Sequence, residues 1–227
     1  MQDYPKLLLQ ASKSMEVNRV CLVVTFPRFM AWSPVKNDYE RAAILKSKTG
    51  FEESPRSGEA DILDLFKKQL LALNTCPLCN PSSEERIRIE DGAYVCLWPE
   101  SGACTDELHH HIGRNVVIKK GSVLVIRARD WYLDNFTLQG CCVIDDRWSV
   151  RGMKSEGSIA LVNTKIENKG WHYVDIGKND MSLSIITRMR GYAVERDEQC
   201  EITVNAPGEH ILRDVTITSS CRLAYEN

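Results

Sequence analysis

Two stretches decide the fold: VIKKGSVLVI at Val117–Ile126 and VNAPGEHILRDVTI at Val204–Ile217. Each has aliphatic residues on both sides of a Gly or Pro-Gly corner, spaced as if they face one interior. From about Glu84 onward, short β-rich runs of this kind recur, separated by Gly, Asn and Asp. The pattern predicts a mainly β region. It favours a β-solenoid, specifically a hexapeptide-like β-helix without a fixed period, and leaves an antiparallel sandwich or barrel open as the alternative.

The first 75 residues have a different texture, which predicts α/β structure. Apolar spacing predicts a helix at Tyr4–Met15, and the apolar run Val20–Val24 predicts a strand covered on both faces. A short helix is expected at Asp38–Lys46. A longer amphipathic helix ends near Leu73, with Ser57 or Asp61 as its cap. The predicted organisation is therefore an α/β segment at 1–75, a linker at 76–83 and the β-solenoid at 84–227.

Composition narrows the class of protein. The 227 residues include 29 Lys and Arg against 31 Asp and Glu, a net charge of -2, which argues against a general nucleic-acid binder. No apolar run has the length of a membrane span, and the N-terminus has no signal or transit pattern. The nine scattered cysteines indicate mostly reduced thiols. These features predict a soluble intracellular protein that binds neither nucleic acid nor membrane.

Two short motifs carry a family resemblance. Trp32–Asn37 reads WSPVKN, and Ser57–Asp61 reads SGEAD about twenty residues later. Together they resemble the late catalytic-domain motif of eukaryotic-type UDP-sugar pyrophosphorylases. The nearest branch is the chloroplast type of UTP–glucose-1-phosphate uridylyltransferase with C-terminal hexapeptide-like repeats. The resemblance implies that residues 1–75 are the α/β end of a nucleotidyltransferase catalytic domain.

The resemblance also implies a reaction and a set of site residues. UTP and glucose 1-phosphate would give UDP-glucose and pyrophosphate, with Mg²⁺ as cofactor and sulfolipid synthesis in the chloroplast stroma as the setting. Such enzymes act mainly by positioning anions and neutralising charge. A Lys on a Pro-stiffened loop is a preset cation, so Lys36 is the expected catalytic residue. The expected substrate-binding residues are Ser33, Lys36, Asn37, Arg56, Ser57 and Glu59.

One departure from the family pattern is important. Members have a Gly-rich loop that cradles the UTP phosphates, and nothing before Val20 or in the β-rich region supplies one. The chain is therefore expected to be the last part of a catalytic domain plus a C-terminal domain, and inactive alone. Without the family context, Ser33–Asn37 is an ordinary turn with a solvated lysine.

Other constellations lead to competing hypotheses. A non-catalytic β-solenoid module for binding or homo-oligomerisation is the main rival. A solenoid acyltransferase with His172 or His210 as general base is the second. Cys76 and Cys79 form a Cys-x-x-Cys pair that Cys96 and Cys104 could complete as a zinc site, but the irregular spacing makes zinc an unfavoured prediction. His109–His111 is interpreted as a polar turn.

Overall fold

The structure is a computed structural model that describes residues 33–76, 85–102, 104–146, 157–176 and 180–226. The helix predicted at Tyr4–Met15 and the strand predicted at Val20–Val24 lie outside these residues. So does most of the predicted linker.

Two helices open the described chain. Helix α3 spans Tyr39–Thr49, and the side chain of Asp38 caps it by accepting a hydrogen bond from the backbone N–H of Arg41. Helix α4 spans Pro55–Leu71 and continues into the short 3-10 turn Ala72–Asn74. The helix predicted at Asp38–Lys46 is therefore confirmed, and its capped start matches the sequence within one residue.

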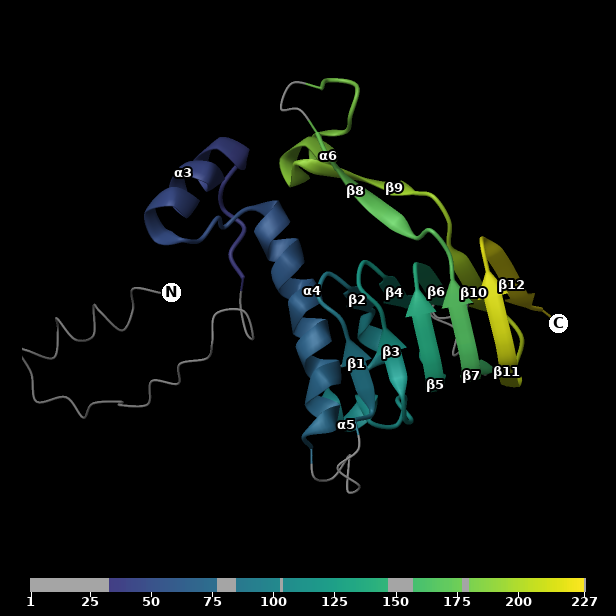
Figure 1. The fold of residues 1–227 in the computed structure, drawn as a ribbon. Helices are drawn as coiled ribbons and strands as arrows, with labels where there is room; N and C mark the ends of the chain where they lie inside the picture. The colour runs from purple at the N-terminus through teal and green to yellow at the C-terminus, as the bar shows by residue number, and fades with distance from the viewer. Residues whose placement is uncertain (1–32, 77–84, 103, 147–156, 177–179, 227) are drawn as a thin grey trace, which may run out of the picture.

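Two five-stranded parallel sheets follow (Figure 1). The first sheet has the order β1-β3-β5-β7-β11 and the second the order β12-β10-β6-β4-β2. The strands of the first sheet are β1 Ile87–Ile89, β3 Val116–Ile118, β5 Trp131–Gln139, β7 Gly157–Glu167 and β11 Gly208–Thr218. Those of the second are β2 Tyr94–Leu97, β4 Val123–Ile126, β6 Cys141–Asp145, β10 Cys200–Val204 and β12 Cys221–Tyr225.

One core lies between the two sheets. Alternate residues of the strands point into it, as Leu133 and Ile166 do from the first sheet and Leu124 and Ile202 from the second. Helix α4 covers the end formed by β1 and β2, and Leu70 and Leu73 are fully buried there. The helix that carries one of the two motifs is thus fixed to the sheets by apolar burial.

An antiparallel ribbon leaves this framework between β7 and β10. It consists of β8, Trp171–Asp175, and β9, Tyr192–Arg196, with helix α6, Ile185–Arg190, near its tip. We call β8, α6 and β9 the arm. Figure 1 shows the arm reaching back over the second sheet toward α3 and α4. The remaining short elements are the 3-10 turn Pro99–Ser101 and helix α5, Thr105–Leu108.

The predicted fold class is wrong. Instead of a mainly β, hexapeptide-like β-solenoid, the described chain is α/β, with two five-stranded parallel sheets, helices and an antiparallel arm. A hexapeptide-like repeat requires a constant spacing between stacked residues. Here Val117 pairs with Thr137, whereas Gly157 pairs with Gly208, 51 residues later, and strand lengths run from three to eleven residues. The antiparallel sandwich is wrong too, because every pair within the two sheets is parallel.

No helix among the described residues combines the length and the apolar character needed to cross a membrane.

Candidate functional site

The two sequence motifs meet at one junction. The Ser33 hydroxyl donates to Oδ2 of Asp61 at 2.5 Å, which links the first residue of the loop to helix α4. Beside this bond, Gly58 is buried under Val35: a Cβ at Gly58 would lie only 2.6 Å from Cγ2 of Val35. The glycine of SGEAD therefore lets the Ser33–Asn37 loop pack directly on α4.

Backbone hydrogen bonds fix the Lys36 segment. The backbone N–H groups of Lys36 and Asn37 both donate to the carbonyl of Glu53, at 2.8 and 3.0 Å. The Asn37 side chain donates to the carbonyl of Glu52 at 3.1 Å and so holds the turn, and its predicted contact with substrate remains a prediction. The Lys36 side chain is exposed, while its backbone is held by the hydrogen bonds to Glu53.

The start of α4 uses a reciprocal cap. The Ser54 hydroxyl accepts from the N–H of Ser57, and the Ser57 hydroxyl accepts from the N–H of Ser54, at 3.2 and 3.0 Å. The cap is thus Ser54, and the prediction of Ser57 or Asp61 as cap is wrong. Pro55 occupies the first turn, where its missing N–H costs nothing. The hydrogen bonds of Ser57 serve the cap, and its predicted contact with substrate remains a prediction.

Glu59 joins α4 to the arm. Its Oε2 accepts from the Tyr192 hydroxyl at 2.5 Å and pairs with Nε of Arg190 at 3.0 Å. Burial, reinforced by the hydrogen bond to Glu59, raises the pKa of the Tyr192 phenol, so Tyr192 stays protonated and donates. Tyr173 of β8 packs edge-on against Tyr192 with ring centroids 5.3 Å apart, and burial raises the pKa of Tyr173 to about 12. Glu59 therefore anchors the arm, and its predicted role in substrate binding remains a prediction.

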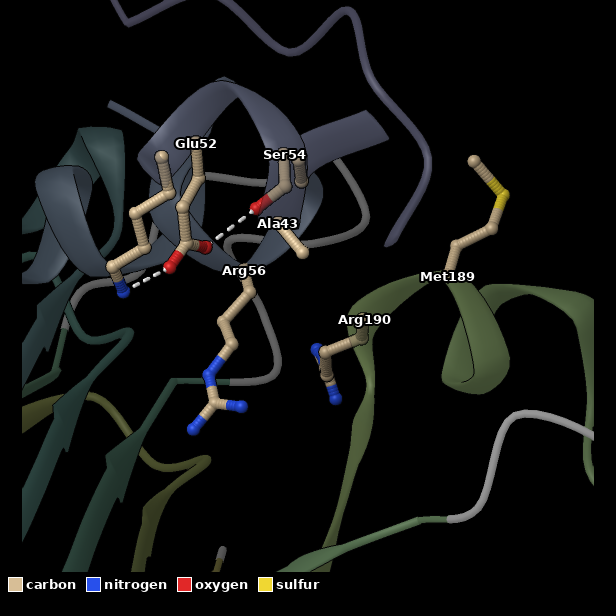
Figure 2. A pocket seen from close by; sticks show the side chains of 8 residues that line it. Ala43, Glu52, Ser54, Arg56, Met189 and Arg190 are labelled. Atoms are coloured by element: carbon tan, nitrogen blue, oxygen red, sulfur yellow. Dashed lines mark hydrogen bonds and ion pairs between the residues drawn. The ribbon is translucent and has the colours of Figure 1, made fainter. Parts of the chain in front are cut away.

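A pocket of about 350 Å³ lies between α3, the start of α4, and α6. Its charged lining residues are Lys46, Glu52, Arg56 and Arg190 (Figure 2). Lys46 and Glu52 form an ion pair, and Ser54 donates to the other Glu52 oxygen at 3.1 Å. The hydrogen bond from Lys46 is the main cause that lowers the pKa of Glu52. Of the predicted site residues only Arg56 lines this pocket; Lys36 does not.

Sequence reasoning missed Lys46 and Arg190. Lys46 could have been found, because it is a basic residue of the helix that directly follows the Lys36 loop. Arg190 could not have been found from its neighbours in the sequence. It lies 134 positions after Arg56 and reaches α4 only because the arm folds back to it.

The cysteine and histidine candidates are spread over the fold. Cys76 packs against the main core, Cys96 lies on the outer side of the second sheet beside Trp171, and Cys79 lies outside the described residues. Within the described ranges, no group of three or more His, Cys, Asp or Glu side chains is placed to hold a metal ion. His111 stacks on Trp131 at 4.6 Å, and Nε2 of His210 lies 3.1 Å from the Ala206 carbonyl.

The pKa of His172 tests the structure of the arm, because His172 pairs with two carboxylates. Its Nδ1 lies 2.7 Å from Asp197, and its Nε2 lies 3.1 Å from Glu195. The hydrogen bond to Asp197 is the main cause that raises the pKa of His172. A raised pKa in the folded state means that the favourable pairing is present at low pH and is lost as pH rises through that pKa.

We expect Asp197→Asn to lower the pKa of His172 in an NMR titration, and Glu209→Gln, on β11, to leave it unchanged. An unchanged pKa in Asp197→Asn would contradict the described pair.

Among the relatives that comparison with known proteins gives, two share the same description. A UDP-sugar pyrophosphorylase of Arabidopsis thaliana is 24% identical over 221 residues, covering 94% of this chain and 32% of the relative. A UDP-sugar pyrophosphorylase of Oryza sativa subsp. indica is 26% identical over 208 residues, covering 89% and 30%. No family model matches the chain. The chain is similar to UDP-sugar pyrophosphorylases and spans about a third of the length of these curated relatives.

Proposed function

We propose that this chain takes part in a UTP:sugar-1-phosphate uridylyltransferase reaction as the segment that carries Lys36 to the sugar phosphate. The observation that carries the proposal is the similarity over nearly the whole chain to two proteins described as UDP-sugar pyrophosphorylases. The junction of the two motifs supports it, since Ser33, Val35 and Lys36 are held against the SGEAD helix by the Asp61, Gly58 and Glu53 contacts.

In this reaction a phosphate oxygen of the sugar 1-phosphate attacks the α-phosphorus of UTP. The bond between the α- and β-phosphates breaks, and pyrophosphate leaves with the electron pair of that bond. Both reactants are anions, so a fixed cation lowers the barrier by reducing their repulsion and by stabilising the charge that develops. Lys36 has that role in the proposal: Pro34 is buried and the Glu53 carbonyl holds the backbone, so binding of phosphate orders the lysine side chain but does not have to order the backbone.

Three finer points rest on the family resemblance alone. Glucose 1-phosphate is the expected sugar phosphate, the chloroplast stroma the expected setting and Mg²⁺ the expected ion. The ion would neutralise charge on the phosphates. The described residues form no acidic cluster that fits it, so the reaction is described without assigning the ion a step. The sequence also has no Gly-rich nucleotide loop, and we therefore expect this chain alone to bind a sugar nucleotide without turning it over.

The test is calorimetry with UDP-glucose and glucose 1-phosphate. Replacing Lys36 by alanine removes a charge-assisted contact worth about 1.5–3 kcal/mol, so we expect binding to weaken at least tenfold. Lys48→Ala is the matched control, because Lys48 is an exposed lysine in the last turn of α3, and it should bind as the unmodified chain does.

The contrary result also has a meaning. Absence of binding by the unmodified chain, or equal binding by Lys36→Ala, would contradict the proposal. The same absence, found together with a stable homo-oligomer in light scattering, would favour the non-catalytic binding or oligomerisation module.

A further inference from the structure

The pocket between α3 and α6 has an excess of positive charge. Lys46, Arg56 and Arg190 contribute three cations to its lining, and Glu52 contributes one carboxylate. The single carboxylate is already engaged, by Lys46 on one oxygen and Ser54 on the other. The Arg56 and Arg190 guanidinium groups therefore define the electrostatic character of the remaining space.

Both guanidinium groups share one aromatic support. The Arg56 and Arg190 Cζ atoms lie 5.6 and 5.2 Å from the ring centroid of Tyr192. Cation–π contact with a ring that is itself hydrogen-bonded to Glu59 holds the two planes in place. Figure 2 shows the two groups on facing sides of the pocket. Two positive charges that line the same pocket favour the binding of an anion between them.

The existing partners of the two arginines leave donors for a ligand. Arg190 meets Glu59 through Nε at 3.0 Å, and Arg56 meets Asp175 through Nη1 at 3.3 Å. Each guanidinium has five N–H donors in a planar fork, and these contacts use a minority of them. The Asp175 side chain is 81% exposed, so its pair with Arg56 is weak and can yield to a ligand.

We propose that this pocket binds the phosphate group of a small phosphate ester, held between Arg56 of α4 and Arg190 of the arm. Planar guanidinium forks match the oxygens of phosphate better than a lysine ammonium does. The N-terminus of the 17-residue helix α4 adds a partial positive charge on the same side. Ala43 and Met189 also line the pocket and give the rest of the ester an apolar wall.

The inference is independent of the uridylyltransferase proposal. Lys36 does not line this pocket, and any phosphate ester of suitable size would satisfy the two arginines. Equal binding by Lys36→Ala would contradict the Lys36 proposal alone, and unchanged affinity in Arg56→Gln and Arg190→Gln would contradict the pocket proposal alone. Absence of glucose 1-phosphate binding by the unmodified chain would contradict the pocket proposal, and the Lys36 proposal as well if UDP-glucose also fails to bind.

The test measures binding of glucose 1-phosphate and of inorganic phosphate by calorimetry to the full chain and to Arg56→Gln and Arg190→Gln. We expect at least a tenfold loss of affinity for glucose 1-phosphate in each variant, and weaker binding of inorganic phosphate than of the ester to the unmodified chain. Arg196→Gln is the matched control, because Arg196 lies on the same arm but over the Trp171 ring, and it should change neither affinity.

Four results would overturn the proposal. They are no binding of the ester by the unmodified chain, unchanged affinity in Arg56→Gln and Arg190→Gln, an equal loss in Arg196→Gln, or binding of inorganic phosphate as tight as that of the ester. Urea unfolding of each variant separates lost binding from lost folding. If Arg190→Gln unfolds, Arg190→Lys keeps the charge, removes the fork and should still lose affinity.

Discussion

Replacing Gly140 by alanine is expected to lower the free energy of unfolding by about 3–4 kcal/mol. Gly140 turns the chain from β5 to β6 with φ of 107°, a conformation that costs a residue with a side chain strain energy. A Cβ there would lie 2.3 Å from the backbone oxygen of Asn168 and 2.2 Å from its side-chain oxygen. Asn168 has no room to withdraw, because its amide group bonds the N–H and the carbonyl of Cys141. Urea unfolding measures the effect.

Gly121→Ala is the matched control for this prediction. Gly121 turns the chain from β3 to β4 with φ of 72°, but a Cβ there would have no atom within 4 Å. It should therefore show the conformational cost alone, about 1 kcal/mol. If the two variants unfold at the same urea concentration, the close approach of Gly140 and Asn168 does not occur as described.

Local structure could be predicted from the sequence where the deciding residues are neighbours in the chain. The short helix expected at Asp38–Lys46 corresponds to α3, and the apolar spacing up to Leu73 predicted α4. Most of the β-rich runs from Ile87 onward contain strands, but the run at Ser182–Val194 was wrong in part, because helix α6 occupies Ile185–Arg190 within it. In each case the signal comes from residues only a few positions apart, as in helix caps and in the alternation of buried and exposed residues along a strand.

The arrangement of the strands could not be predicted in this way, because it depends on partners at unequal distances. Three asparagine side chains and one aspartate side chain form a continuous row across the strands of the first sheet. Asn115 donates to Asn135 at 2.6 Å, Asn135 to Asn163 at 2.7 Å, and Asn163 to Asp214 at 2.5 Å. All four residues have positive φ. A row spaced by 20, 28 and 51 residues has no period for a repeat search to find.

In the candidate site too, contacts between residues close in sequence could be predicted and contacts between distant residues could not. Two motifs within about thirty residues were expected to act together, and the structure brings them into contact through Ser33, Val35 and Gly58. The roles predicted for Lys36 and Arg56 remain predictions. The arm was invisible to sequence reasoning, because β8 and β9 resemble any other β-rich run until the pairing of Trp171 with Arg196 is known.

Replacing Glu59 by alanine is expected to loosen the attachment of the arm to α4. The contacts of Arg56 with Asp175 and with the Tyr192 ring are left in place. Oε2 of Glu59 accepts from both the Tyr192 hydroxyl and Arg190 Nε, so one substitution removes both links. Tyr192 is buried, and the loss of the partner of its hydroxyl costs about 1–2 kcal/mol. The Arg190 pair adds less than about 1 kcal/mol, because both side chains are about a third exposed. A total of about 2 kcal/mol corresponds to roughly thirtyfold faster amide exchange in β8 and β9.

Hydrogen exchange followed by mass spectrometry measures this directly, because the arm and the two sheets report separately. Asp64→Ala is the matched control, since Asp64 lies on the same helix and pairs with Lys68 on its exposed side. The faster exchange should be confined to the arm, because the core between the sheets does not depend on Glu59. Glu59→Gln keeps an acceptor for Tyr192 and loses the charge facing Arg190, so it should show a smaller increase. If Glu59→Ala leaves exchange in β8 and β9 unchanged, Glu59 does not anchor the arm. If exchange rises equally in the sheets, the arm and the sheets unfold as one unit.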